Sequence, residues 1–199
     1  MNDLDCNKRK DIPFHPAINP PYGAMESNFK FYLENVKPLV AEICTQKMNG
    51  MHGLDTHTNA VVFRGIDYAL SLRQNPTPVI FACAFHDMAR IDDGLDLEHG
   101  KRAIPMAIKI MKQFPNLLDK ETRLNIMSAV LNHTTGTTAP DYISACLWDA
   151  DRTRLAWKYG FESKFFNTLR GAHVASNYFL RYLEFQRKCF PYLTWAKQY

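Results

Sequence analysis

Apolar residues recur at helical spacing along most of this 199-residue chain. Between Thr56 and about Gln74 they return every three or four positions, which is the spacing of a helix with one broad apolar face. The segment from Thr77 to about Arg90 is apolar on every side, which is typical of a helix buried among others. A buried strand is the competing interpretation for that segment. No strand-like alternation and no internal repeat appears, so the sequence predicts an all-α bundle of several helices.

Capping residues and helix breakers set the other predicted boundaries. A first helix is expected from Ser27, with a kink or restart at Pro38 and an end at Asn49-Gly50. Later helices are predicted from about Asp96 with a kink or restart at Pro105, from Asp119 to His133, from Pro140 through Trp157, and from near Glu162 onward, where Tyr178, Tyr182 and Phe185 share one face.

Residues 1–25 differ from the rest of the chain. Pro13, Pro16, Pro20 and Pro21 resist helix formation and favour an extended, polyproline-like arm. Apolar residues between the prolines favour packing of this arm on the domain, whereas a solvated tail is the alternative. The chain length suits one buried domain rather than two. We therefore predict an extended arm over 1–25 and a single helical domain over 26–199.

Composition and charge narrow the function classes. Apolar residues make up 46% of the chain and charged residues 22%, as in ordinary soluble domains. The net charge of +4 favours a small anionic ligand and is too weak to indicate nucleic-acid binding. The five cysteines form no C-x-x-C pair, which is typical of reduced thiols, and neither a signal peptide nor a membrane-spanning run is visible. We expect a cytoplasmic protein without membrane contact. The sequence does not decide whether the protein forms a homo-oligomer.

His86 and Asp87 close the most apolar segment of the chain. A buried carboxylate without a partner costs several kcal/mol, so Asp87 needs a cation, a metal ion or strong hydrogen bonds. Adjacent helical residues point about 100° apart, so both side chains reach one ion only from a helix end or an opened turn. An ion pair between Asp87 and Arg90 is the alternative. Further histidines and aspartates along the chain favour a metal site.

Three separated pieces of the sequence form a recognisable pattern. They are His57 in the stretch HGLDTHTNAV, the doublet His86-Asp87, and Asp151 in an Ala-Asp-Arg sequence. Together they resemble the H…HD…D pattern of the HD-domain superfamily of metal-dependent phosphohydrolases, over about residues 50–157. The resemblance implies an HD-like helical bundle in which these four residues bind a divalent ion. Their imidazole and carboxylate groups suit Mn²⁺, Fe²⁺, Co²⁺, Ni²⁺, Zn²⁺ or Mg²⁺ without selecting among them.

Other residues could extend this site. By the same resemblance, His99 and His133 are candidates for binding a second ion or the phosphate of a substrate, so one or two ions are expected for each chain. Asp149 is an alternative to Asp151 as ligand, or a group that orients a ligand. His52 is either a pocket residue or a surface histidine.

The resemblance implies hydrolysis of a small phosphate ester or nucleotide. The ion would activate a water molecule and polarise a phosphoryl oxygen, and nearby cationic side chains would stabilise the negative charge that develops. The candidates for that phosphate contact, which could equally be solvated surface charges, are Arg90, Lys101, Arg102 and Arg152. Asp87 or Asp92 could act as general base, and the sequence does not choose between them.

Two other functions fit the same residues. A di-iron oxygenase with the HD fold, in which His99 and His133 complete the centre, would make the protein an oxidoreductase. A non-catalytic sensor would bind a nucleotide without turning it over, although the presence of all four expected ligands favours an enzyme. No base-recognition motif is visible, so nucleotides, sugar phosphates and other phosphate esters stay open as substrates.

Overall fold

The computed structural model describes residues 20–45, 50–159 and 163–175. All regular secondary structure in these ranges is helical, so the all-α prediction is confirmed. The helices are α1 (Tyr22–Phe31), α2 (Lys37–Ile43), α3 (Asn59–Ser71), α4 (Pro76–Phe85), α5 (His99–Met111), α6 (Lys120–Asn132), α7 (Tyr142–Tyr159) and α8 (Leu169–His173). Short π-helical turns at Tyr32–Val36 and Leu54–Thr58 precede α2 and α3, and a 3₁₀ turn at Ser163–Phe165 precedes α8.

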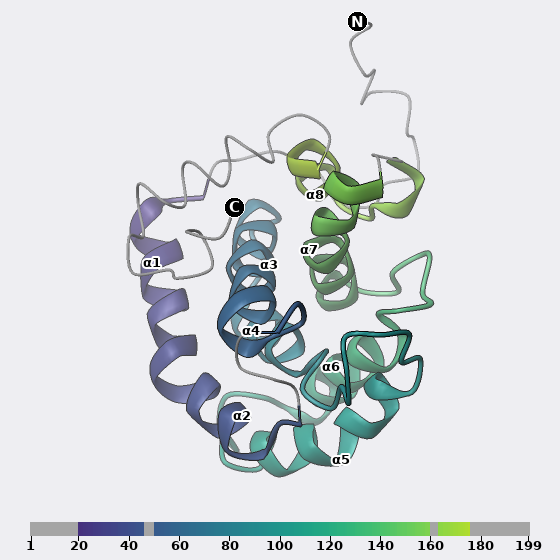
Figure 1. Ribbon diagram of the computed structural model, residues 1–199. Helices are drawn as coiled ribbons and strands as arrows, with labels where there is room; N and C mark the ends of the chain where they lie inside the picture. Colours follow the sequence, from purple (N-terminus) through teal and green to yellow (C-terminus); the bar gives the residue numbers. More distant parts are fainter. Residues whose placement is uncertain (1–19, 46–49, 160–162, 176–199) are drawn as a thin grey trace, which may run out of the picture.

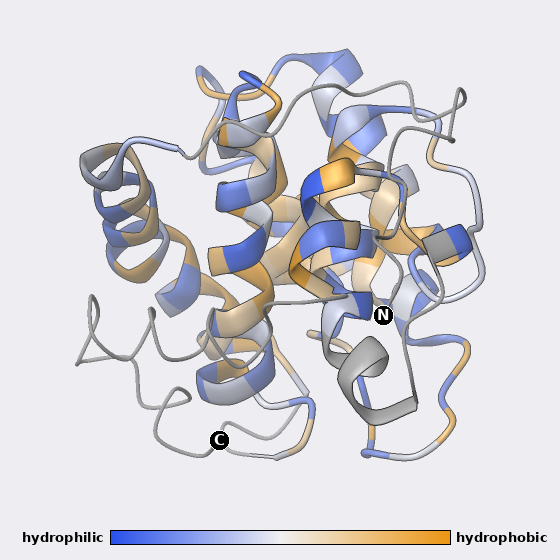
Figure 2. Cartoon of the chain, turned by 90° about the horizontal axis from the view of Figure 1, so that it is seen from above, coloured by the Kyte–Doolittle hydropathy of each residue, from blue (hydrophilic) through white to orange (hydrophobic). Residues whose placement is uncertain are grey.

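Helix α4 lies at the centre of the bundle. Figure 1 shows α3 and α4 in the middle, α1 and α2 along one side, α7 along the other, and α5 and α6 across one end. Every side chain from Pro78 to Phe85 is buried, as the apolar pattern of this segment predicts. Seen from above in Figure 2, hydrophobic residues gather where the helices face one another, and hydrophilic residues follow the outer turns.

Polar contacts attach α7 and α8 to α3. The Arg64 Nε donates to the carbonyl oxygen of Ala150 at 2.8 Å, one residue before Asp151 in α7. The Arg170 guanidinium binds both carboxylate oxygens of buried Asp67, at 2.9 and 3.1 Å, and so ties α8 to α3. These contacts hold the part of α7 that carries Asp151 against α3. Helix α3 directly follows the turn that carries His57, so Asp151 and His57 are brought close together.

The first helix differs from its prediction. It begins at Tyr22 with Pro21 as N-cap residue, earlier than Ser27, because the fixed φ of proline suits the start of a helix. Residues 22–25 are therefore helical and not part of an extended arm, whereas residues 1–19 lie outside the described residues. The predicted restart at Pro38 is confirmed, since α2 begins at Lys37 with Pro38 in its first turn.

Helix α4 also ends earlier than predicted. It stops at Phe85 rather than near Arg90, and residues 86–89 form turns. His86 is the C-cap residue, and the backbone N–H of Arg90 donates to the carbonyl of Asp87 at 3.0 Å. The chain therefore leaves helical geometry at the His86-Asp87 doublet, as the sequence requires if both side chains are to face one site.

The remaining boundaries follow the sequence more closely. Helix α5 begins at His99 rather than near Asp96 and runs through Pro105 as one helix, and α6 is capped by the Asp119 carboxylate, which accepts from Thr122 N–H at 2.7 Å. The prediction of one long helix from near Glu162 is wrong for residues 163–173, where a 3₁₀ turn and the short helix α8 are separated by the non-helical residues 166–168. The aromatic face predicted at Tyr178, Tyr182 and Phe185 lies outside the described residues.

Two general predictions concern thiols and membranes. The cysteines of the described segments, Cys44, Cys83 and Cys146, carry free thiols, in agreement with the prediction of reduced cysteines. Across those segments, each helix is too short or too polar to cross a membrane.

The contact between α3 and α4 depends on the small size of Gly65. A Cβ atom there would lie 2.6 Å from Cys83 Sγ and 3.0 Å from Val79 Cγ1. Gly65→Ala should therefore lower the free energy of unfolding by about 1–3 kcal/mol despite its better helix propensity. Adding Cys83→Ala should recover most of that loss. Chemical denaturation measures both effects, with Gly23→Ala as control because a Cβ there meets no atom within 4 Å. A Gly65→Ala variant as stable as the wild type contradicts this packing.

Candidate metal centre

Six predicted side chains from five parts of the chain meet in one place, five of them at or next to helix ends and the sixth in the middle of a helix. His57 lies in the π-helical turn before α3, and His86 and Asp87 directly follow α4. His99 is the first residue of α5, His133 follows α6, and Asp151 lies within α7. The side chains form two groups of possible metal ligands, namely His57, His86 and Asp151 in the first and Asp87, His99 and His133 in the second. All are buried except Asp151, whose side chain is 21% exposed.

The first group has the spacing of ligands around one ion. The Nε2 atom of His57 lies 3.2 Å from the Nε2 atom of His86 and 3.0 Å from Oδ1 of Asp151. The third side of this triangle, from His86 Nε2 to Asp151 Oδ1, measures 3.9 Å. Neighbouring ligands at about 2.1 Å from an ion are themselves separated by about 3 Å or slightly more. The three atoms can therefore bind one divalent ion with small adjustments.

The second group is equally compact. The Nε2 atom of His99 lies 3.0 Å from Oδ1 of Asp87 and 2.7 Å from Nε2 of His133. His133 Nε2 lies 3.8 Å from the same Asp87 oxygen. Two imidazole lone pairs at such a distance repel each other unless a proton or a cation lies between them. A cation between His99, His133 and Asp87 would remove that repulsion.

Asp87 joins the two groups. Its Oδ2 atom faces the first group, at 3.4 Å from His86 Nε2 and 3.6 Å from His57 Nε2, whereas its Oδ1 atom faces the second. Because each oxygen of a carboxylate can bind a cation, Asp87 is placed to bridge two ions. The donor set of four imidazoles and two carboxylates therefore fits one or two divalent ions.

Three of the imidazoles are held in the orientation that metal ligands need. The Nδ1 atoms of His86, His99 and His133 each contact the backbone carbonyl three residues earlier, with distances of 2.7 Å for His86 and 2.6 Å for His133. The three carbonyls belong to Cys83, Asp96 and Val130. A carbonyl can only accept, so Nδ1 carries the proton and the Nε2 lone pair points into the centre. Buried His57 Nδ1 has no such partner in the described part of the chain.

The charges of the centre are strongly coupled. Burial lowers the pKa of His57 to about 4. Burial acts in the same direction on His86, but the Asp87 carboxylate outweighs it and raises the pKa of His86 to about 9. Burial alone would raise the pKa values of Asp87 and Asp151. His86 instead holds the pKa of Asp87 well below its usual range, and a hydrogen bond from His57 lowers the pKa of Asp151. At neutral pH, a proton on His86 thus takes the place that a metal ion would occupy.

His52 is a member of this site that the sequence left undecided. Its Nδ1 atom lies 3.0 Å from Asp87 Oδ2, and its side chain is 24% exposed. Its backbone N–H donates to Asp93 Oδ1 at 3.1 Å, which fixes it beside the centre. Its position five residues before His57 was the available signal, but only the tertiary contact with Asp87 distinguishes it from a surface histidine.

Asp149 faces away from the ligands. Its carboxylate accepts hydrogen bonds from the backbone N–H of Asn167, at 2.8 Å, and of Thr168, at 2.6 Å. Burial raises the pKa of Asp149 to about 6, although these hydrogen bonds oppose the shift. Asp149 therefore anchors the segment before α8, whereas Asp151 is the aspartate that the fold brings to His57.

The basic residues predicted to bind phosphate have protein partners in this structure. Arg90 donates to Asp87 Oδ1 at 2.9 Å and to Gly94 O at 3.0 Å. Arg102 donates to Ala89 O at 3.1 Å and to the Asp96 carboxylate. Arg152 donates to the carbonyls of Phe165, His133 and Gly136, and exposed Lys101 lies 3.8 Å from Glu98. A phosphate contact by any of the four stays a prediction.

Comparisons of the chain with models of protein families, with curated proteins and with solved structures find no match. A metal centre is therefore inferred from the spacing of the ligand atoms, the buried charges and the H…HD…D pattern of the sequence.

The second ligand group depends on Gly100. A Cβ atom at this position would lie 2.7 Å from Val130 O, the carbonyl that orients His133. Gly100→Ala should push the start of α5 away from the end of α6, separate His99 from His133, and lower affinity for a second ion about 10- to 100-fold. Metal titration with elemental analysis measures this loss, and Gly23→Ala is the matched control. Unchanged binding of a second ion by Gly100→Ala would contradict the assignment.

Metal uptake should release protons and become stronger as pH rises. A metal ion must displace the proton of His86, whose pKa is raised to about 9 by Asp87 against the burial that lowers it. The folded metal-free protein binds this proton more tightly than the unfolded chain, so this stabilisation is present below pH 6.5 and is lost as pH rises toward 9. Calorimetry in buffers of different ionisation enthalpy counts the protons released at pH 7.5. Uptake without proton release would show that His86 is not a ligand.

Proposed function

We propose that this protein is a metal-dependent phosphohydrolase of the HD type, which hydrolyses a small phosphate ester. The observation that carries the proposal is the placement of Asp87, whose two carboxylate oxygens face two separate groups of buried ligand atoms. The order of the ligands along the chain, H…HD…D with two further histidines, supports the same function.

The chemistry expected of such a centre suits phosphate esters. A divalent ion supplies an activated water molecule and a Lewis acid that polarises a phosphoryl oxygen. The buried histidines and aspartates hold the ligand atoms in place, because backbone carbonyls fix the rings of His86, His99 and His133. His52 and Asp151 are the solvent-facing members of the site, so a substrate would approach from their side.

The possible general bases differ in their surroundings. Imidazoles, with His86 foremost, hold the pKa of Asp87 well below its usual range although burial opposes this, and Arg90 donates to its Oδ1 atom at 2.9 Å. Asp92 lies on an exposed loop, where its Oδ1 atom accepts from Gly94 N–H at 2.7 Å. These surroundings favour Asp87 as a ligand. The proton of the attacking water would then pass to an exposed group or to solvent, with a bound ion lowering the pKa of that water.

A di-iron oxygenase is the second candidate. The two ligand groups, which face opposite oxygens of the Asp87 carboxylate, could hold two iron ions side by side. The same arrangement fits a two-metal hydrolytic centre, so the bound metal and the reaction distinguish the two functions. Oxygen consumption by the iron-loaded protein, without release of phosphate from any ester, would select this function over hydrolysis.

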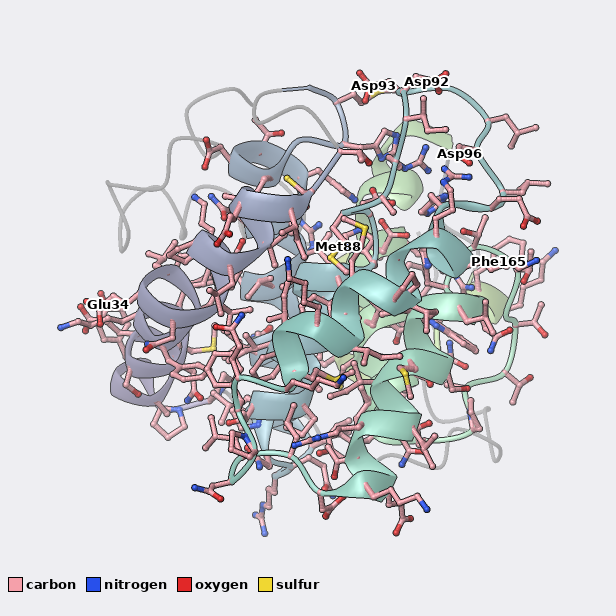
Figure 3. The ribbon with its side chains drawn as sticks, turned by 90° about the horizontal axis from the view of Figure 1, so that it is seen from below. Glu34, Met88, Asp92, Asp93, Asp96 and Phe165 are labelled. Atoms are coloured by element: carbon pink, nitrogen blue, oxygen red, sulfur yellow. The ribbon has the colours of Figure 1, made fainter. Side chains whose placement is uncertain are left out.

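The proposed function is tested by removing the bridging carboxylate. Asp87→Asn keeps the shape of the side chain but removes its charge, so it should lower phosphate release by about 100-fold or more and reduce the bound metal. Activity is measured on a panel of phosphomonoesters and diesters, with each divalent metal in turn. Glu34→Gln is the matched control, because this exposed carboxylate lies on α1's side of the molecule and pairs only weakly with Lys30 (Figure 3). Full activity of the Asp87→Asn variant would contradict the proposed centre.

A further inference from the structure

Three large apolar side chains are exposed on the loop that connects two ligands of the centre. Residues 91–97 run from the turn that carries Asp87 to His99 at the start of α5. On this loop, Ile91 is 70% exposed, Leu95 90% and Leu97 58%. Large apolar side chains exposed together on a short segment are typical of surfaces that bind a ligand or a partner.

The loop is held in shape by polar contacts and not by burial of its apolar side chains. The Ile91 N–H donates to Asp96 Oδ2 at 3.3 Å, and Arg102 binds the same carboxylate. Gly94 accepts from Arg90 at 3.0 Å and donates to Asp92 at 2.7 Å. Figure 3 shows Asp92 and Asp93 at the edge of the molecule and Asp96 nearby. A loop fixed in this way presents its apolar groups at low entropic cost to a ligand.

The loop is joined to the metal ligands at two points. Arg90 spans from Asp87 Oδ1 to the carbonyl of Gly94, and the Asp93 carboxylate holds the backbone of His52, whose ring contacts Asp87 Oδ2. His52 is 24% exposed and is preceded by Met51, which is 43% exposed. The loop therefore borders the side on which the centre reaches solvent.

The charges on this side disfavour a ligand with several negative groups. Asp92, Asp93 and Glu98 are exposed on or beside the loop, and the charge of exposed Lys101 is partly offset by Glu98 at 3.8 Å. The nearby guanidinium groups of Arg90 and Arg102 already donate to protein oxygens. Metal ions at the centre could neutralise one phosphoryl group, whereas additional phosphates would face carboxylates.

We propose that residues 91–97 form a substrate-selecting rim, which takes the apolar group of a phosphate ester whose only charged group is the phosphoryl group at the centre. This inference rests on the proposed hydrolytic function and adds a substrate class to it. Alkyl or aryl phosphates belong to this class, and nucleoside triphosphates and sugar bisphosphates do not.

The test compares methyl, butyl and octyl phosphate as substrates of the manganese-loaded protein, below the concentrations at which they aggregate. Full burial of one methylene corresponds to about a fourfold gain in binding, so an open rim should raise kcat/KM roughly twofold for each methylene. From butyl to octyl phosphate, a difference of four methylenes, the expected gain is roughly 16-fold, and a nucleoside triphosphate should be a poorer substrate than butyl phosphate. Leu95→Ser and Leu95→Ser/Leu97→Ser should flatten this dependence, so that kcat/KM falls more for octyl phosphate than for methyl phosphate.

Leu124→Ser is the matched control, because Leu124 is 52% exposed on α6 and lies outside the rim. The proposed rim would be contradicted if kcat/KM did not depend on chain length, or if it depended on chain length equally in Leu95→Ser. Either result would still be compatible with the hydrolytic function. A change of oligomeric state in Leu95→Ser without a change in chain-length dependence would assign the loop to a contact between copies and would also overturn the rim. Binding of octylphosphonate can be measured by calorimetry in the wild type and in Leu95→Ser. If the wild type binds it, Leu95→Ser does not, and no ester is hydrolysed, the result would support the rim and contradict the hydrolytic function.

Discussion

The burial of the Asp87 carboxylate is the constraint on which the rest of the site depends. Asp87 is 2% exposed and follows a helix whose side chains are buried from Pro78 onward. A charge in such surroundings is tolerated only where partners reach it from every direction. Imidazoles from the ends of other elements and the guanidinium of Arg90 supply those partners. The convergence of helix ends around one carboxylate creates the centre.

Close packing makes that convergence possible. Gly65 lets α3 approach α4, and Gly100 lets the start of α5 approach the end of α6. The polar contacts of Arg64 and Arg170 then hold α7 and α8 against α3, so that Asp151 reaches His57. Carbonyls in the last turns of α4 and α6 fix the imidazole rings. The same elements that form the apolar core therefore also set the ligand geometry.

Local patterns in the sequence predicted most of the helices, and the H…HD…D pattern named side chains that the fold brings together, whereas contacts between distant segments could not be predicted. The apolar run through α4 correctly indicated a buried helix, and the capping aspartate before α6 was correctly placed. The end of α4 at Phe85 was missed, because apolar spacing does not show where a helix opens to place two side chains. The choice between Asp149 and Asp151, the role of His52 and the partners of the arginines all depend on tertiary contacts. Periodicity carries no information about those contacts.

In the proposed centre, the carboxylate of Asp87 would lie between two metal positions. Anomalous diffraction from crystals soaked in Mn²⁺ tests this most directly. We expect two anomalous peaks roughly 3.5–4 Å apart, one among His57, His86 and Asp151 and one beside His99 and His133, with the Asp87 carboxylate between them. A single peak that does not contact Asp87, or no peak among these residues at saturating Mn²⁺, would contradict it.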